Sequence, residues 1–365
     1  QAGANTLLSG QNLGTSGTGN ISSVAVTPAS YLALNLGMFG LDDRISIGLS
    51  NTTPFGSTTE NDYDSAARFH GRTSEVRVIN SSPTIGFRVN EAFSVAAGLQ
   101  VSFADVRLTQ AAAVPSPVPG LGLEVDTDVE GFDRALGWTV GATFSPTERT
   151  EIGIGFRSAV FHELDGTFQV SGPSPQVQRD LGGITAELNL PELLSIGLRH
   201  QATQSLTLLA GFEWQNWSRF KELRIDFDTP GAPDAVTLQN YEDGYYFSLG
   251  AEYAVNEDLT VRGGLGYEIS PVQDEFRSVR QPDSDRIWAS LGASYEFNDR
   301  FALNVSYSHI FADDAPINLA LADNPSRGTL RGEGNTSIDI VGISLRSKFG
   351  HSAPTEEVRD VFYKP

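Results

Sequence analysis

The chain has 365 residues, among them 45 acidic and 25 basic side chains, 37 glycines and no cysteine. The lack of cysteine excludes disulfides, thiolate metal sites and thiol catalysis. The net charge of −20 argues against a nucleic-acid partner, because phosphate backbones are negative as well. Charged residues make up 19% of the chain, below the roughly 25% of soluble domains, and the fold has to account for this low fraction.

The first part of the chain, residues 1–41, carries no charge, but Gly, Ser, Thr and Asn are frequent in it and Pro28 interrupts it. It is therefore too polar for a membrane-spanning helix, which needs about 20 predominantly apolar residues. No later segment has the composition of such a helix either.

Apolar side chains recur at every second position in most of the chain, and no segment keeps a helical period. A period of two is the pattern of β-strands with one apolar face. The chain is therefore predicted to be all-β. The thirteen expected strands lie near 26–38, 43–53, 73–89, 92–110, 134–146, 150–170, 184–200, 205–227, 242–255, 258–270, 285–297, 300–312 and 336–349.

The connections between these strands alternate in length. Every second connection is a short turn, such as Asn90-Glu91 and Asn298-Asp299. In an antiparallel sheet all of these short turns lie at the same end. The strands also exceed the soluble mode of about 5 to 6 residues. Both features are typical of outer-membrane barrels and predict a transmembrane antiparallel β-barrel. The long polar loops at the other end lie near 54–72, 111–133, 171–183, 228–241, 271–284 and 313–335.

In such a barrel the apolar alternate positions face lipid, and the small and polar positions face the lumen. Bacterial single-chain barrels have an even number of strands, so we expect one further strand, running outward, upstream of the first. Residues 1–25 are then a polar outer loop after that missing strand, 26–349 are the barrel, and 350–365 are a periplasmic tail.

Five short segments stand out by their residues: Thr53-Pro54-Phe55-Gly56, Leu190-Pro191-Glu192, Asn216-Trp217-Ser218-Arg219-Phe220 followed by Glu222-Leu223-Arg224, Ser270-Pro271-Val272, and Pro282-Asp283-Ser284-Asp285-Arg286-Ile287-Trp288. Each is weak alone. In order and spacing, from about residue 27 to Phe349, they resemble the FadL family of outer-membrane transporters for long-chain fatty acids and other hydrophobic compounds, which includes the TodX-like hydrocarbon channels.

The resemblance implies a 14-stranded barrel in the outer membrane of a Gram-negative bacterium, with a lumen plugged by an N-terminal hatch that carries an Asn-Pro-Ala motif. This chain lacks that motif, since its only Pro-Ala is Pro28-Ala29 in an expected strand. The thirteen strands match the family's second to fourteenth, so the hatch and first strand are expected upstream of residue 1. The segment after Phe349 is a second departure, because relatives tend to end on such an aromatic residue.

The resemblance further implies passive transport: outer loops capture a hydrophobic molecule, an interior pocket holds it, and an opening in the wall releases it sideways into the membrane. Long-chain fatty acids are the first expectation, and aromatic or alkane hydrocarbons are the alternative. Burial contributes about 0.8 kcal/mol per methylene, so capture needs no chemistry.

The opening is expected at a kink in the strand 73–89, where Asn80, Ser81, Ser82 and Pro83 interrupt the apolar alternation and Pro lacks a ladder donor. An ordinary bulge is the alternative. The capture surface is expected in loops 111–133 and 171–183, or these loops pack on themselves; its apolar residues are Val114, Val118, Leu121 and Leu123.

Ionic side chains occupy several expected lumen positions: Arg77, Arg157, Arg199, Glu213, Glu252, Arg262, Glu268, Arg286 and Arg346. A carboxylate ligand favours a cationic partner there. Arg157 and Arg286 are the first candidates. The nearby Glu268 and Asp285 leave open a lumen network of paired charges instead. The complete expected pocket consists of Arg157, Arg286, Trp288, Arg77 and Phe161.

No cofactor and no metal is expected. Asp126-Thr127-Asp128 opens like a calcium loop, but the twelfth position is Gly137 instead of Glu. An enzyme would need a Ser/His/Asp set near the outer rim; His70 and His162 are candidates for that rim, but neither lies in a recognisable nucleophile motif, so the chain is expected not to be an enzyme. A structural or adhesive surface protein is a further alternative.

The expected partners are hydrophobic small molecules, outer-membrane lipid and lipopolysaccharide, but no nucleic acid, and the barrel is expected to be a monomer.

Overall fold

The computed structural model describes residues 7–8, 11–12, 21, 23–115, 122–172, 179–320 and 327–349. Seventeen strand segments form one closed barrel, and four pairs of consecutive segments are the two halves of one bent strand, so the wall has thirteen crossings. All recorded pairings in it are antiparallel. The predicted antiparallel β-barrel with thirteen readable strands is confirmed. Within the described ranges, no helix is long and apolar enough to cross a membrane.

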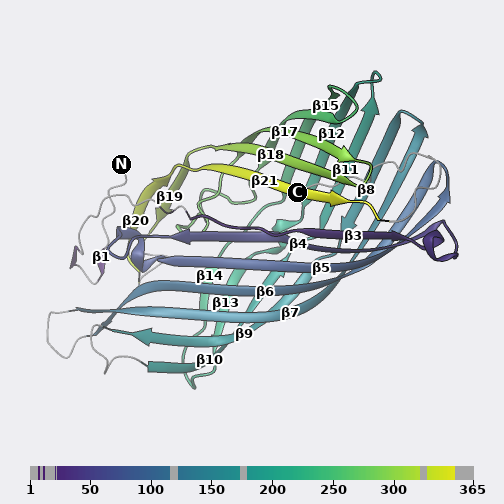
Figure 1. The fold of residues 1–365 in the computed structure, drawn as a ribbon. Coiled ribbons are helices and arrows are strands. Elements are labelled where there is room, and N and C mark those ends of the chain that lie inside the picture. Colours follow the sequence, from purple (N-terminus) through teal and green to yellow (C-terminus); the bar gives the residue numbers. More distant parts are fainter. Residues whose placement is uncertain are drawn as a thin grey trace.

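The wall begins with five unbroken strands that lie side by side in Figure 1. The next four crossings are each divided into two segments, and four unbroken strands complete the wall. The bounds are β3 Ser30–Asn35, β4 Ile45–Glu60, β5 Thr73–Asn90, β6 Phe93–Pro115, β7 Gly122–Thr147, β8 Thr150–Arg157, β9 Val160–Ser171, β10 Arg179–Leu190, β11 Leu193–Gln201, β12 Leu206–Gln215, β13 Glu222–Phe227, β14 Ala235–Leu238, β15 Gly244–Ala254, β16 Leu259–Ile269, β17 Arg286–Asn298, β18 Phe301–Ala312 and β21 Ser337–Ser347.

The short connections lie at one end of the barrel, as the alternation of loop lengths predicts. The first is a 3₁₀ turn, η1 Leu36–Phe39, which Gly40 ends with a φ of 75° that a side chain would strain. At the other end in Figure 1 lies the hairpin of β19 Ala315–Leu319 and β20 Leu330–Gly334. The expected loop 313–335 therefore contains paired strands, and a small separate pair, β1 Leu7–Leu8 and β2 Gln11–Asn12, precedes the barrel.

The hairpin of β6 and β7 is longer than expected. Their pairing continues to Pro115 opposite Gly122, and β7 also pairs with β9 as far as Ser171. The 23 residues of β6 span roughly 75 Å at about 3.3 Å per residue, whereas about 9–11 residues cross a membrane. Most of the expected loop 111–133 is therefore extended sheet, because sheet pairing persists beyond the bilayer.

The two faces of the strands differ as predicted. On β6, Leu99 is exposed on the outer face while its neighbours Gln100 and Ser102 are buried on the inner face. On β17, Ile287 and Leu291 are exposed in the same way. Half or more of the surface of these apolar side chains faces outward, which accounts for the low charge fraction of the chain.

The outer half of the lumen is filled by an apolar cluster. Val78 on β5 and Ala104 on β6 are fully buried in one cluster with side chains of β9, β10 and β13, strands that follow β7 in the same wall. The cluster consists of Val78, Ala104, Val160, Leu164, Ile184, Ala186, Leu188, Leu190 and Ile225. Apolar residues therefore lie inside at this level, and the rule that assigns every apolar position to lipid does not hold there.

Four consecutive crossings bend at one level of the barrel. The breaks fall between β8 and β9, β10 and β11, β12 and β13, and β14 and β15. The third break contains the 3₁₀ turn η4, Trp217–Arg219. Two of the five family-like segments, 190–192 and 216–220, lie at these breaks.

The seam between β21 and β3 has no paired register in the described part of the wall. The strand order makes them neighbours, but over the described residues β21 has a paired register only with β18, and β3 only with β4. Both run toward the short-turn end, so an outward strand between them would pair antiparallel with each. The further strand stays a prediction, and the seam is the place for it.

Candidate functional site

An aromatic contact crosses the lumen at the level of the bends. The ring centroids of Phe55 on β4 and Trp217 in η4 lie 5.4 Å apart at 79°, an edge-to-face arrangement. Trp217 also meets Phe220 at 6.4 Å and Tyr241 at 6.1 Å. Since β4 and η4 belong to distant parts of the wall, these rings narrow the passage between them.

The segment that carries Trp217 is held by the second bend. Glu192 accepts a hydrogen bond from Asn216 Nδ2 at 3.0 Å and from Arg219 Nε at 2.7 Å. Gln215 Oε1 accepts from Trp217 Nε1 at 2.7 Å. Pro191 lacks the backbone donor that a continuing strand would need, so the strand breaks there and leaves Glu192 free to bind η4.

Phe55 reaches the lumen because β4 has an extra residue. The register between β4 and β5 shifts between Thr52 and Phe55, where Thr53 and Pro54 face only Ile79. Such a bulge re-aims the side chain that follows it. The segment 53–56 therefore serves to direct the side chain of Phe55 into the lumen.

The remaining two family-like segments join the same region. A Cβ at Gly244 would lie 3.4 Å from Cδ1 of Trp217 and 3.7 Å from Cδ of Pro271, so the tryptophan and this proline pack against one glycine. Ser270 N donates to Asp285 Oδ1 at 2.9 Å, and Ser270 Oγ donates to Asp283 Oδ2 at 2.7 Å. All five segments thus form one connected arrangement around the constriction.

A cavity of about 20 Å³ lies beside the constriction, with room for roughly one water molecule. It brings together Arg157 of the expected pocket and Asn80 of the expected opening. Asn80 is 3% exposed, and its Oδ1 has no partner within the described structure. The lining residues are Pro54, Phe55, Asn80, Gln100, Ser102, Arg157, Ser158, Val160, Leu190, Pro191 and Leu193.

Arg157 differs from the other arginines assigned to the lumen from the sequence. Across the described ranges, no carboxylate and no hydrogen-bond acceptor is recorded with its guanidinium. The other five each have a carboxylate within 4.0 Å: Arg77, Arg199, Arg262, Arg286 and Arg346. Arg157 is thus a cation that lines a cavity without a counter-charge.

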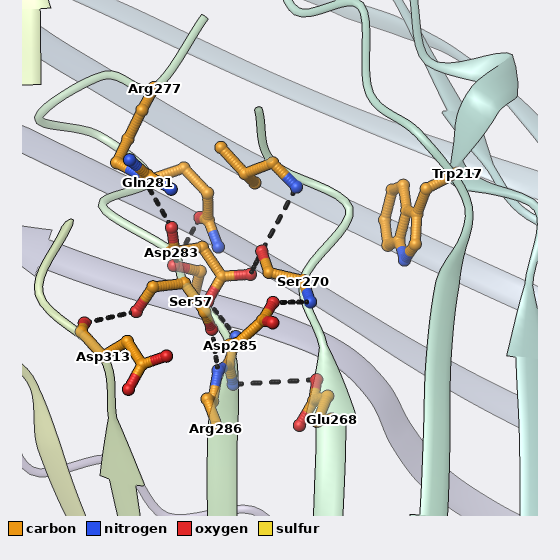
Figure 2. Close-up of polar contacts among 12 residues, drawn as sticks. Ser57, Trp217, Glu268, Ser270, Arg277, Gln281, Asp283, Asp285, Arg286 and Asp313 are labelled. Atoms are coloured by element: carbon orange, nitrogen blue, oxygen red, sulfur yellow. Dashed lines mark hydrogen bonds and ion pairs between the residues drawn. The ribbon is translucent and has the colours of Figure 1, made fainter. Parts of the chain in front are cut away.

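Arg286 belongs to a network of paired charges, the alternative that the sequence left open. Figure 2 shows its guanidinium between Asp283 and Glu268. Asp283 makes the close ion pair, and Glu268 Oε1 lies 3.9 Å away. Glu268 also accepts a hydrogen bond from Trp288 Nε1 at 2.9 Å, so both expected pocket residues on β17 are held by one carboxylate. Asp285, the other carboxylate named for such a network, accepts hydrogen bonds from Ser270 N and Tyr267 Oη.

Arg77 and Phe161 lie away from the cavity. Arg77 is on the face of β5 opposite to buried Val78 and pairs with Asp105 at 3.7 Å. Phe161 is on the face of β9 opposite to buried His162, 59% exposed, with the guanidinium of Arg219 over its ring at 5.7 Å. The sequence pattern placed both inside because it takes no account of the apolar filling of the outer lumen.

The expected kink at Asn80, Ser81, Ser82 and Pro83 is not a break in β5. The strand runs through it, and Asn80 and Ser82 point inward on the same side as Val78. Pairing with β6 skips only Ser82 and Pro83. A Cβ on Gly98 would lie 2.7 Å from the carbonyl oxygen of Pro83, so this glycine lets the two strands close at that point. The register shift lies on β4 instead.

The expected capture residues fall on the hairpin tip. Val114 and Leu123 face each other in the backbone register of β6 and β7. Val118 and Leu121 lie outside the described residues, as do 173–178, all of 350–365 and most of residues 1–25. Their role as a capture surface stays a prediction.

A cap of loop segments covers the outer end. The loop 271–284 reaches β4 through Ser57 Oγ, which donates to Gln281 Oε1 at 3.1 Å, a contact drawn in Figure 2. Arg280 donates to the carbonyl oxygens of Thr73 at 2.9 Å and Thr109 at 3.2 Å. Burial lowers the pKa of Arg280 to about 9.

His70 follows η2 Ala66–Phe69 in the same cap. It is 3% exposed, and its Nε2 has no partner in the described part of the chain. Burial, followed by the charge of Arg327, lowers the pKa of His70 to about 4. The cap therefore holds a neutral imidazole.

Phe55 and Trp217 belong to the family-like segments, but neither was predicted to lie in the site. The available signal was their position next to Pro54 and inside the Asn-Trp-Ser-Arg segment, both of which interrupt strands. Which wall each ring would meet was not readable, because these segments lie about 160 residues apart in the sequence and meet only across the barrel.

Comparison with known proteins supports the same fold. The solved structure of a FadL homologue from Pseudomonas aeruginosa superposes with a TM-score of 0.82 at 23% identity, covering 94% of this chain and 85% of that one. The Pseudomonas putida toluene transporter TodX gives a TM-score of 0.69 at 17% identity, with 96% and 88% covered. These similarities show the barrel fold.

Curated relatives are similar in sequence. A long-chain fatty acid transport protein of Escherichia coli O6:H1 is 25% identical over 300 residues, covering 74% of this chain and 67% of the relative. A 47 kDa outer membrane protein of Pasteurella multocida is 28% identical over 318 residues, covering 80% and 71%. A family profile matches residues 2–349. The chain therefore belongs to the outer membrane protein transport family OMPP1/FadL/TodX and is a β-barrel of the Gram-negative outer membrane.

Proposed function

We propose that this barrel carries hydrophobic molecules with an acidic head group, long-chain fatty acids first, across the outer membrane without a chemical step and as a monomer. The observation that supports this most directly is Arg157, a cation without a carboxylate beside an apolar and aromatic constriction. A charge-assisted hydrogen bond between a guanidinium and a carboxylate is worth about 1.5–3 kcal/mol. The acyl chain would lie against Phe55, Val160, Leu190 and Leu193.

Aromatic and alkane hydrocarbons are the second candidate. The edge-to-face rings of Phe55, Trp217, Phe220 and Tyr241 favour flat apolar molecules, which offer the same contacts. Such molecules do not use Arg157. The dependence of uptake on Arg157 therefore separates the two candidates.

Exit is proposed between β5 and β6. Pairing is missing there at Ser82 and Pro83, and Asn80 two residues away lines the cavity. Capture at the outer hairpin of β6 and β7, in contact with lipopolysaccharide, is proposed as the first step. The capture residues remain Val114, Val118, Leu121 and Leu123.

The exit is tested by closing it. The chain has no cysteine, so a Ser82→Cys/Gln100→Cys pair forms the only possible disulfide. Both positions lie between the paired residues Ser81–Val101 and Thr84–Gly98 of β5 and β6, in the stretch where pairing is missing. Uptake of a labelled fatty acid into liposomes should fall on oxidation and return on reduction.

The matched control joins Ser290→Cys and Ser308→Cys, which oppose each other on β17 and β18. This bridge should leave uptake unchanged, because it lies in an intact ladder. Equal uptake with the first bridge open and closed would show that exit uses another route. Uptake no faster than in empty liposomes would refute transport itself.

A further inference from the structure

Three inward side chains form a hydrogen-bonded chain beside the cavity, and transport makes no use of it. Ser102 Oγ on β6 lies 3.0 Å from Nε2 of His162 on β9. Nδ1 of His162 lies 3.0 Å from Oδ2 of Asp133 on β7. Ser102 and His162 are each 2% exposed.

The direction of these hydrogen bonds follows from their donors and acceptors. An ionised carboxylate only accepts, so Nδ1 of His162 carries the proton and donates to Asp133. In the neutral imidazole, Nε2 is then the acceptor and receives the hydroxyl proton of Ser102. This is the arrangement of an activated serine: a nucleophile bonded to a base that a carboxylate orients. Asp133 also accepts from the backbone N–H of Glu163 at 3.2 Å, which fixes its position.

The barrel brings these residues together at the level of the bends. The register of β7 with β9 ends at Phe132 opposite Asp165, and the register of β7 with β8 begins at Thr139 opposite Arg157. Between these points the wall bends, and His162 turns to Ser102, which belongs to the strand beyond β7. No nucleophile motif surrounds His162 in the sequence, because Ser102, Asp133 and His162 are separated by about 30 residues each and meet only in the wall.

Ser102 has the surroundings that acyl transfer needs. It lines the same cavity as Arg157, whose guanidinium has no counter-charge among the described residues. Gln100 lines it as well and donates one of its two Nε2 hydrogens to Trp138 O at 2.8 Å, which leaves the second hydrogen. An amide hydrogen and a guanidinium are donors of the kind that stabilise a developing oxyanion. The cavity holds about one water molecule, so an acyl group enters only when the constriction opens.

Other hydroxyl groups in the described wall lack this arrangement. Ser290 Oγ meets only the hydroxyl of Ser308 at 2.8 Å. Thr150 Oγ1 meets His200 at 3.0 Å, but His200 is exposed and no carboxylate is recorded on its other nitrogen. Over the residues that the structure describes, Ser102 is the hydroxyl joined through a histidine to a carboxylate.

We propose that Ser102 is a nucleophile that cleaves acyl esters in the lumen, with His162 as the base and Asp133 as the residue that positions it. Ser102 Oγ forms a bond to the ester carbonyl carbon while its proton passes to His162 Nε2. The bond from that carbon to the alkoxy oxygen then breaks, and the proton passes from His162 to this oxygen, which leaves as the alcohol. Water gives a proton to His162 and adds to the acyl carbon; the bond to Oγ breaks, Oγ regains the proton, and the carboxylic acid is released.

This activity is separate from the proposed transport. Its product is an acid of the class that Arg157 is proposed to hold, so the barrel would accept both free acids and their esters. The substrate class is an ester of a long acyl chain, because the cavity offers apolar walls for such a chain: Pro54, Phe55, Val160, Leu190, Pro191 and Leu193.

The test uses the whole barrel in detergent micelles and an alkyl fluorophosphonate, which reacts with activated serines. Intact mass should show one adduct, and peptide mapping should place it on Ser102. Ser102→Ala should lose the adduct. His162→Gln should slow its formation by about a hundredfold or more, the usual contribution of a general base. Ser290→Ala, on the far wall, should react as the unaltered protein does.

Asp133 needs a readout that a structural role alone would not change. Asp133→Asn should slow adduct formation, and Asp133→Glu should restore part of the rate, because a carboxylate again fixes the imidazole. All variants are compared only if they keep the resistance to cold SDS that marks a closed barrel. Absence of an adduct on Ser102 in a barrel that still takes up fatty acid would overturn the proposal. So would an adduct whose rate is unchanged by His162→Gln.

Discussion

Arg157 and Arg286 are two arginines on the inner wall with opposite surroundings. Arg286 lies between Asp283 and Glu268, and its environment is completed by the loop that carries Ser270. Arg157 lines a cavity with Phe55 and Leu190, and no carboxylate in the described structure meets it. The first cation stabilises the protein, whereas the second is available to a ligand.

The two arginines differ in surroundings because the residues next to them at the strand ends differ in charge. β17 follows a loop that supplies two aspartates, Asp283 and Asp285, directly before Arg286. β8 ends at Arg157 and is followed by a bend whose next residues, Ser158 and Ala159, carry no charge. An alternating pattern gives the face of a residue, and the residues around the strand end decide whether its charge is already paired.

The largest expected effect concerns Arg286, the arginine whose charge is paired. Asp283→Asn removes the close partner of Arg286 and leaves a mostly buried cation with Glu268 at 3.9 Å. Breaking a buried pair costs about 3–5 kcal/mol. We expect the free energy of unfolding in urea to fall by about 3 kcal/mol. Asp43→Asn, which breaks an exposed pair with Arg88, should change it by less than about 1 kcal/mol; equal losses would remove the contrast.

The cap above both arginines should open in acid. The pKa of His70 is lowered by burial to about 4 in the folded cap, against about 6.5 when exposed. The open form therefore binds the proton more readily, and cap stability is full above about pH 6.5 and falls by about 3 kcal/mol as the pH drops to about 4. Hydrogen exchange of residues 66–70, corrected for intrinsic rates, should show this loss.

His70→Gln provides the control for the acid effect, because the amide does not titrate in this range. Exchange in the variant should be independent of pH between about 4 and 6.5. A wild-type cap that is equally protected at both pH values would contradict the assignment of a neutral, buried imidazole.

Arg157 should control whether the barrel prefers a ligand with a carboxylate head group. Arg157→Gln should reduce the preference for a fatty acid over the alcohol of equal chain length by about 2 kcal/mol, or roughly thirtyfold, since one charge-assisted hydrogen bond is lost. Competition binding of the two ligands measures this ratio. Arg286→Gln should lower stability and leave the ratio unchanged. A ratio that follows Arg286 instead would reverse the roles of the two arginines.

The smallest expected effect concerns the contact between the rings of Phe55 and Trp217 at the constriction. A double-mutant cycle with Phe55→Leu and Trp217→Leu should give a coupling of about 1 kcal/mol, the value of an edge-to-face pair beyond its buried area. Unfolding in urea measures it. Additive losses would mean that the rings do not hold the constriction together.

Several features were predictable because they repeat along the strands. Leu99, Ile287 and Leu291 were assigned to the outer face, and they are exposed there. The alternation of short and long connections gave the antiparallel barrel and its two ends. Residues such as Val78 were misassigned, because the filling of the outer lumen depends on side chains from β9 and β10 that the local pattern does not include.

The sequence by itself determined the strand periodicity, the thirteen crossings and the family, since each depends on residues that are near one another or in a fixed order. The tertiary structure decided which side chains meet across the barrel. Phe55 and Trp217 are joined only by closure of the wall, and so are Ser102, His162 and Asp133. A closed barrel brings distant strands within a few ångströms of one another, and no local pattern records which residues will face each other there.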